Sequence, residues 1–134
     1  MGKPDSRDVR AAAGGADPSD RGLADDGAYT YLWEYLVRPD AEAEFLRHYG
    51  PEGSWVRLFR RAAGYVGTRL YRDRDQPLRY LTVDVWEHRQ AFEDFRRRFA
   101  DDFEQLDRAC ALLTLREAPL GTFQDVPTPT RPTT

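Results

Sequence analysis

Asp84 is the residue of this sequence best suited to acid–base chemistry. It lies in the segment 79–86, RYLTVDVW, whose alternation is typical of a strand. The two-residue period of a strand places Thr82 and Trp86 on the same face as Asp84. An acid in the middle of a sheet needs a partner, because burial alone favours its neutral form. We expect Arg69, on the neighbouring strand, to be that partner. The pair is either a structural ion pair or, if it opens to a cavity, a general base beside a cation.

Phenylalanines at helical spacing form the clearest periodic pattern in the chain. Phe92, Phe95, Phe99 and Phe103 recur every three or four residues, which predicts a helix with one apolar face. Such a stripe is more typical of a core than of a ligand site. Any cavity beside it would be lined by flat apolar groups and would suit an aromatic or polycyclic ligand.

Residue types that bind metals and cofactors are scarce. His48 and His88 are the only histidines and Cys110 is the only cysteine, and no spaced set of three ligands can be assembled from them and the acidic residues. No glycine-rich phosphate loop, dinucleotide fingerprint or nucleophile elbow occurs. We therefore expect no metal site and no nucleotide, haem or flavin cofactor.

Charge and hydropathy argue against two further classes of partner. The chain has 20 basic and 23 acidic residues, interleaved along most of its length, and a formal net charge of −3. Binding to nucleic acid needs a region of unopposed positive charge, which this pattern lacks. No apolar segment is long enough for a signal peptide or a membrane span. We expect a cytoplasmic protein with no nucleic-acid or membrane partner.

The 134 residues fit one domain with a tail at each end. Residues 1–28 are rich in Gly, Ala, Asp, Ser and Pro, and residues 126–134 are rich in Pro and Thr. Neither segment can bury enough apolar surface to offset the entropy of ordering, so both are expected to be disordered. Residues 29–125 are predicted to form the folded domain.

The folded part is predicted to be an α+β domain with the ferredoxin-like order β-α-β-β-α-β. Right-handed connections would place its helices on one face of a four-stranded antiparallel sheet. The last strand contains Pro119 and Gly121, which predicts an edge or bulged position. Strands are expected at 29–37, 65–71, 79–86 and 114–123, and short helices at 40–49 and from 54 to about 62. One long helix is expected at 88–113; Asp101 and Asp102 could mark a kink in it, although the apolar stripe continues across them.

Both faces of the predicted sheet carry large apolar side chains. On the first strand Trp33 and Tyr35 point one way, while Leu32 and Leu36 point the other way. A solvated face would be mostly polar. One chain has only enough helix to cover one face. We therefore expect a second copy of the chain to cover the other face and complete a dimeric α/β barrel.

The order and spacing of these segments resemble the antibiotic biosynthesis monooxygenase (ABM) family. Residues 80–87 (YLTVDVWE), followed by 90–92 (QAF), resemble the family's strand that ends in Trp and the helix that begins with Ala-Phe. Residues 33–45 (WEYLVRPDAEAEF) resemble the first strand and first helix, and residues 64–68 (GYVGT) resemble the second strand. The likeness covers residues 29–123, nearly the whole predicted domain.

The resemblance implies a dimeric α/β barrel with a pocket between sheet and helices in each subunit. Some relatives oxidise aromatic polyketides with oxygen and no cofactor, others degrade haem, and related barrels catalyse cyclisations or isomerisations. The expected site consists of the catalytic residues Asp84, Trp86 and Arg69 and the substrate-contacting residues Trp33, Tyr35, Thr82, Phe92 and Phe95.

The sequence departs from the patterns of both catalytic branches. Cofactor-free monooxygenases carry an Asn four residues before the strand-end Trp and a Tyr six residues after it; this chain has Thr82 and Phe92 there. The haem-degrading branch uses an Asn on the first strand, where Trp33 stands here. It also uses a His on the last helix, and no His follows His88 in this chain. Haem degradation is therefore not expected, and only Trp86 carries over unchanged.

Two classes of function follow from these observations. The first is a cofactor-independent enzyme of secondary metabolism that acts on an aromatic or polyketide-like molecule. As an oxygenase, Trp86 would help bind the substrate phenolate; as a cyclase, Asp84 would remove a proton while an Arg steadies the enolate. The second is a non-catalytic small-molecule-binding or self-association domain of the same fold. An open pocket that exposes Asp84 or Arg69 favours the first class, and a filled core favours the second.

Overall fold

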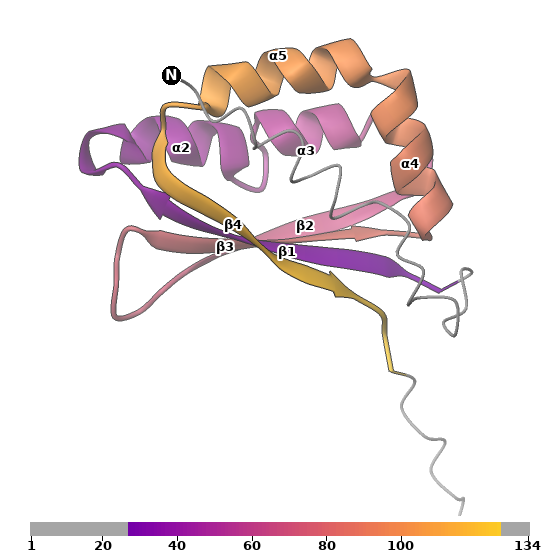
Figure 1. The fold of residues 1–134 in the computed structure, drawn as a ribbon, viewed down its shortest axis with the longest axis horizontal. Coiled ribbons are helices and arrows are strands. Elements are labelled where there is room, and N and C mark those ends of the chain that lie inside the picture. The colour runs from indigo at the N-terminus through magenta and orange to yellow at the C-terminus, as the bar shows by residue number, and fades with distance from the viewer. Residues whose placement is uncertain (1–26, 127–134) are drawn as a thin grey trace, which may run out of the picture.

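A computed structural model describes residues 27–126 of the chain. One sheet lies along one side of this part of the molecule, and all the helices lie on the other side (Figure 1). Residues 1–26 and 127–134 are outside the described residues. The proposed boundaries of the domain and the predicted disorder of its tails therefore stay predictions.

The sheet has the predicted ferredoxin-like topology. Its strand order is β2-β3-β1-β4, and every neighbouring pair is antiparallel. The edge strand β4 is bulged near Pro119 and Gly121, as predicted, because its register against β1 shifts there. The strands are β1 (Tyr29–Val37), β2 (Tyr65–Arg72), β3 (Arg79–Trp86) and β4 (Thr114–Phe123).

The helices all cover the same face of the sheet, as the right-handed connections require (Figure 1). The first connection contains two α-helices and the second contains another two. Together with the sheet they form the two packed layers of an α+β domain. The helical segments are η2 (Pro39–Ala41), α2 (Glu42–Tyr49), α3 (Ser54–Phe59), α4 (Arg89–Arg98) and α5 (Ala100–Cys110).

The prediction of one long helix over residues 88–113 is wrong. The chain leaves the helical conformation at Phe99, where φ is −113° and ψ is 33°, and α4 and α5 point in different directions (Figure 1). Asp101 and Asp102 occupy the first turn of α5, where negative charge favours a new helix start. The Phe99 ring still stacks on Phe95, with centroids 5.6 Å apart. The apolar stripe therefore continues across the break, so the hydrophobic pattern of the sequence does not indicate where the helix ends.

Alternation along the two central strands decides which side chains enter the core. Tyr31, Trp33 and Tyr35 of β1 are buried toward the helices, and residues between them are half-buried on the other face. On β3 the buried positions toward the helices include two polar residues, Thr82 and Asp84. The helix-facing side of the sheet is therefore aromatic with a polar centre.

The opposite face of the sheet, here called the open face, carries apolar side chains, as predicted, and also the ion pairs of Glu34 with Arg79 and Arg116. Leu32 of β1 lies on it next to Val83 of β3, and Leu36 of β1 lies on it opposite Arg79. Tyr71 on β2 is 46% exposed and Phe123 on β4 is 50% exposed. The presence of apolar side chains on both faces confirms the pattern read from the sequence. The dimer inferred from it stays a prediction.

Gly64 is expected to be essential for the turn that leads into β2. Its φ is +88°, and an added Cβ would lie 2.5 Å from the Cβ of Ala91 on α4. A Gly64→Ala substitution should therefore cost about 2–4 kcal/mol of unfolding free energy, measured by denaturant melts. Gly67→Ala is the matched control, because an added Cβ there meets nothing within 4 Å. Equal stability losses in the two variants would contradict this reading of the turn.

Candidate functional site

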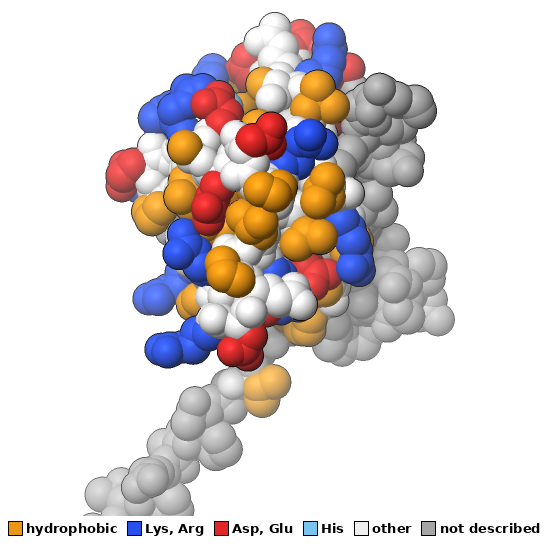
Figure 2. All heavy atoms as spheres, turned by 90° about the vertical axis from the view of Figure 1, so that its left-hand side faces the viewer, with side chains coloured by type: hydrophobic (Ala, Val, Ile, Leu, Met, Phe, Trp, Pro, Cys, Tyr) orange, Lys and Arg blue, Asp and Glu red, His pale blue; other side chains and the backbone are white. Residues whose placement is uncertain are grey.

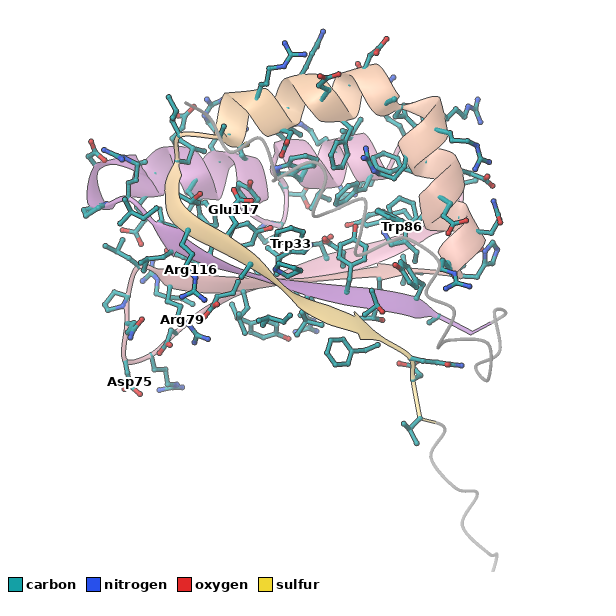
Figure 3. All side chains as sticks on the ribbon, viewed as in Figure 1. Trp33, Asp75, Arg79, Trp86, Arg116 and Glu117 are labelled. Atoms are coloured by element: carbon teal, nitrogen blue, oxygen red, sulfur yellow. The ribbon has the colours of Figure 1, made fainter. Side chains whose placement is uncertain are left out.

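An aromatic layer fills the space between the sheet and the helices. Trp86 is at its centre, with its ring centroid 5.5 Å from that of Phe92 and 5.2 Å from that of Phe95. Trp33 and Tyr35 extend the layer along β1, with centroids 6.4 Å apart. Each of these five side chains is 2% exposed or less. Figure 3 shows Trp33 and Trp86 pointing to the helix side of the sheet. The structure thus brings five of the eight predicted site residues together.

Asp84 lies beside this layer and is almost completely buried, with 2% of its surface exposed. The Thr68 hydroxyl donates a hydrogen bond of 2.6 Å to its Oδ1. The Tyr65 hydroxyl lies 2.6 Å from the Thr68 Oγ1 in turn. Hydrogen bonds to a carboxylate stabilise its charged form, which is the form a general base needs.

The predicted pairing of Arg69 with Asp84 is wrong. Arg69 lies opposite Val83 in the β2–β3 register, so its side chain is on the open face, while Thr68 lies opposite Asp84. A register shift between Tyr65 and Gly67 causes this exchange. Without the extra residue of that bulge, odd-numbered residues of β2 would face the helices and Arg69 would have been among them.

Two further polar contacts cross the aromatic layer, and both are long. The Thr82 hydroxyl donates to the Tyr35 hydroxyl at 3.4 Å, and the Trp86 indole Nε1–H donates to the Tyr31 hydroxyl at 3.4 Å. Hydrogen bonds of this length are weak compared with bonds of 2.7–3.0 Å. A ligand oxygen in the layer could therefore replace either contact at small cost.

A surface hollow of about 200 Å³ lies beside the aromatic layer, between α4 and the turn that precedes β2. Phe95 lines the hollow and also contacts Trp86, so the Phe95 ring separates the hollow from Trp86. The hollow is also lined by Gly64, Glu87, His88, Asp94, Arg98 and Phe99. It thus combines an apolar inner wall with a polar rim of mixed charge, as small-molecule sites do.

The Tyr65 side chain is partly buried, and its surroundings change the pKa of its hydroxyl. Burial raises the pKa of the Tyr65 hydroxyl, and the negative charge of Asp84 raises it further. The hydrogen bond with Thr68 and the charge of Arg60 act in the opposite direction. Because the net pKa is above the ordinary value of a tyrosine, the hydroxyl keeps its proton at neutral pH.

Within residues 27–126, no group of three or more His, Cys, Asp and Glu side chains is arranged to hold a metal ion. No helix in the same range is long and apolar enough to cross a membrane.

At the end of the molecule that includes the start of α2, acidic and basic side chains are interspersed with hydrophobic ones (Figure 2). The expected absence of nucleic-acid and membrane partners stays a prediction.

Thr68 and Tyr65 are site residues that the sequence analysis missed. Counting the hairpin register back from Trp86 without a bulge assigns Thr68 to the open face. The available signal was Gly67, because glycine inside a strand often marks a bulge. With a bulge placed at residues 66–67, Thr68 would have been assigned as the cross-strand neighbour of Asp84.

Comparisons with known proteins agree with this architecture. The model of the family described as "Antibiotic biosynthesis monooxygenase" matches residues 29–105. A Bordetella bronchiseptica structure described as an antibiotic biosynthesis monooxygenase is 26% identical, with a TM-score of 0.60, over 75% of this chain and 98% of that one. No curated protein matches the chain significantly.

Two other similar structures are more distant in sequence. A mutant of SnoaB, a cofactor-independent oxygenase from Streptomyces nogalater, is 24% identical, with a TM-score of 0.60, over 78% of this chain and 97% of that one. PA3566 from Pseudomonas aeruginosa is 15% identical, with a TM-score of 0.61, over 78% of this chain and 99% of that one. At these identities the two structures support the fold.

Proposed function

The chain belongs to the antibiotic biosynthesis monooxygenase family, and on that premise we propose that it oxidises an aromatic or polyketide-like small molecule with oxygen and without a cofactor. Asp84 is the base of this reaction. The proposal is carried by the family match together with a carboxylate, 2% exposed, beside an aromatic layer. The core around Asp84 is filled, which taken alone favours the non-catalytic class, so the proposal requires the aromatic layer to open when the substrate binds.

The proposed reaction begins when Asp84 removes an acidic C–H or O–H proton from the bound substrate. The resulting carbanion or phenolate transfers an electron to oxygen, and the C–O bond of a peroxide forms. Asp84 returns its proton to the peroxide and then removes the second C–H proton as the O–O bond breaks and hydroxide leaves. The net change converts CH₂ and O₂ into C=O and H₂O.

Residues of the aromatic layer have positioning roles in this proposal. Trp86 and Thr82 have hydrogen-bond donors whose present bonds are 3.4 Å long, so they can turn to a substrate oxygen as negative charge develops on it. Trp33, Tyr35 and Phe92 would contact the faces and edges of the substrate rings. The hollow behind Phe95 supports an approach from the α4 side.

Arg69 is not included in this reaction. Its place on the open face separates it from Asp84 by the thickness of the sheet. In a cyclase the same base would form an enolate that attacks a second carbonyl of the substrate, and no oxygen would be consumed. The Trp86 indole Nε1–H then takes the place of the arginine that was expected to steady the enolate.

The test uses anthrone, a tricyclic aromatic ketone with an acidic CH₂ between two rings. The purified protein, without any added cofactor, should convert anthrone to anthraquinone and consume one O₂ per product. General base catalysis predicts a rate at least about 100-fold above buffer. Oxygen uptake is measured with an electrode and anthraquinone by absorbance. A rate no higher than that with the same amount of denatured protein would contradict the proposal and favour a non-catalytic binding or self-association domain.

A further inference from the structure

Three oxygen-bearing groups form a continuous line from the core toward the edge of the sheet. The Asp84 carboxylate accepts from Thr68 at 2.6 Å, and Thr68 lies 2.6 Å from the Tyr65 hydroxyl. Both contacts are at the short end of the O–H···O range. The line therefore consists of two strong hydrogen bonds in series.

The chemistry of the three groups fixes the direction of both hydrogen bonds. An ionised carboxylate only accepts, so Thr68 must donate its single hydrogen to Asp84. The Thr68 oxygen can then only accept from Tyr65, which donates. When Asp84 is protonated, both hydrogen bonds can reverse. Asp84 can then pass a proton to Thr68 while Thr68 passes its own proton to Tyr65, and a proton is released at Tyr65.

The two ends of the line lie in different surroundings. Asp84 is 2% exposed on β3, an inner strand, whereas Tyr65 is only partly buried on β2, the outermost strand on that side. The Tyr65 ring is held between Phe59 and Trp86, with centroid distances of 5.5 and 5.3 Å. Tyr65 is therefore the less buried end of the line, on the outermost strand.

We propose that Thr68 and Tyr65 are the proton path between Asp84 and solvent. This inference rests on the proposed function, in which each turnover leaves one proton on Asp84 and releases one hydroxide ion. The proton passes from Asp84 to Thr68 while Thr68 passes its own proton to Tyr65, and Tyr65 gives one to water. No bond other than O–H bonds forms or breaks, and proton and hydroxide together become water.

A purely structural role for Thr68 predicts a different pattern of variants. If Thr68 only stabilises the buried carboxylate, Tyr65→Phe should behave as the unchanged protein, because the Thr68–Asp84 bond remains. If the line conducts protons, Tyr65→Phe and Thr68→Val should both block proton transfer. Thr68→Ser keeps the hydroxyl and should leave proton transfer intact. Tyr71→Phe is the matched control, since Tyr71 is on the same strand but on the open face.

The first experiment uses the free protein and does not depend on turnover. The ¹³C NMR signal of the Asp84 carboxyl carbon is followed through its titration, where its line shape reports the rate of proton exchange with solvent. This rate should fall by about tenfold or more in Tyr65→Phe and in Thr68→Val, and it should remain unchanged in Thr68→Ser and Tyr71→Phe. Unchanged exchange in Tyr65→Phe would overturn the proposal.

The second experiment follows anthrone oxidation after rapid mixing. The base begins each experiment deprotonated, so Tyr65→Phe should form about one equivalent of anthraquinone per site at the normal rate and then slow. A small external acid–base pair such as imidazole should restore the later turnovers. One outcome would refute the proposed function alone: the unchanged protein does not oxidise anthrone, while proton exchange in the free Tyr65→Phe protein is slow. Normal oxidation and normal exchange in Tyr65→Phe would refute the relay alone.

Discussion

Replacing Asp84 with Asn should lower the rate of anthrone oxidation by about 10²–10⁴-fold, the usual contribution of a positioned general base. The amide has nearly the same shape as the carboxylate, and its Oδ1 can still accept the hydrogen bond from Thr68. The variant should therefore fold. What it loses is a site that can take up a proton from the substrate, so kcat should fall more than the affinity for anthrone.

Asp107 provides the control for this substitution. It is also a buried carboxylate, but it lies on α5 and not on the sheet. Asp107→Asn should leave the rate per folded molecule within about threefold, whatever it does to stability. Steady-state kinetics, with circular dichroism to measure the folded fraction, check both variants. Equal rates for Asp84→Asn and the unchanged protein would remove Asp84 from the mechanism.

The second large effect concerns the open face of the sheet. The unchanged protein should sediment as a dimer of about twice its 15.5 kDa chain mass, with a buried area above roughly 1,500 Å². Leu32 is on β1, one of the two central strands, next to Val83 across the ladder. Leu32→Asp would place one carboxylate from each subunit in that contact, with a cost of about 3 kcal/mol or more per unpaired charge. The dimer should weaken at least about 100-fold.

Leu112→Asp is the matched control for the open face. Leu112 is 69% exposed and follows α5, on the helix side of the molecule. This variant should remain dimeric with an unchanged midpoint of unfolding. Analytical ultracentrifugation over a range of concentrations measures both variants. A monomeric unchanged protein at micromolar concentration would contradict the expected barrel, and so would a dimer that Leu32→Asp leaves intact.

Most of the fold is predictable because it is encoded in short-range patterns. The alternation of Trp33 and Tyr35 with Leu32 and Leu36 determines both the strand and its two apolar faces. The break at Phe99 could not be predicted in the same way. Phe99 keeps its place in the apolar stripe while its backbone leaves the helix, so hydrophobic periodicity carries no record of the break.

The candidate site was predictable in part for the same reason. The shared face of Thr82, Asp84 and Trp86 follows from the period of a single strand, and the structure confirms it. The partner of Asp84 depends on the pairing of β2 with β3. One extra residue in β2 moves each of the residues that follow it to the opposite face of the sheet. The bulge before Gly67 therefore gives Asp84 a threonine neighbour and moves Arg69 to the open face.

Hydrogen–deuterium exchange of anthrone under nitrogen tests whether Asp84 is a base that acts on an aromatic substrate. Without oxygen, proton removal and return replace the acidic CH₂ hydrogens with deuterium from D₂O, and ¹H NMR follows their loss. The protein should accelerate this exchange at least about 100-fold, and Asp84→Asn should abolish the acceleration while Asp107→Asn retains it. Exchange at the rate of buffer alone, or acceleration that survives Asp84→Asn, would contradict the role of Asp84 and the function proposed from it.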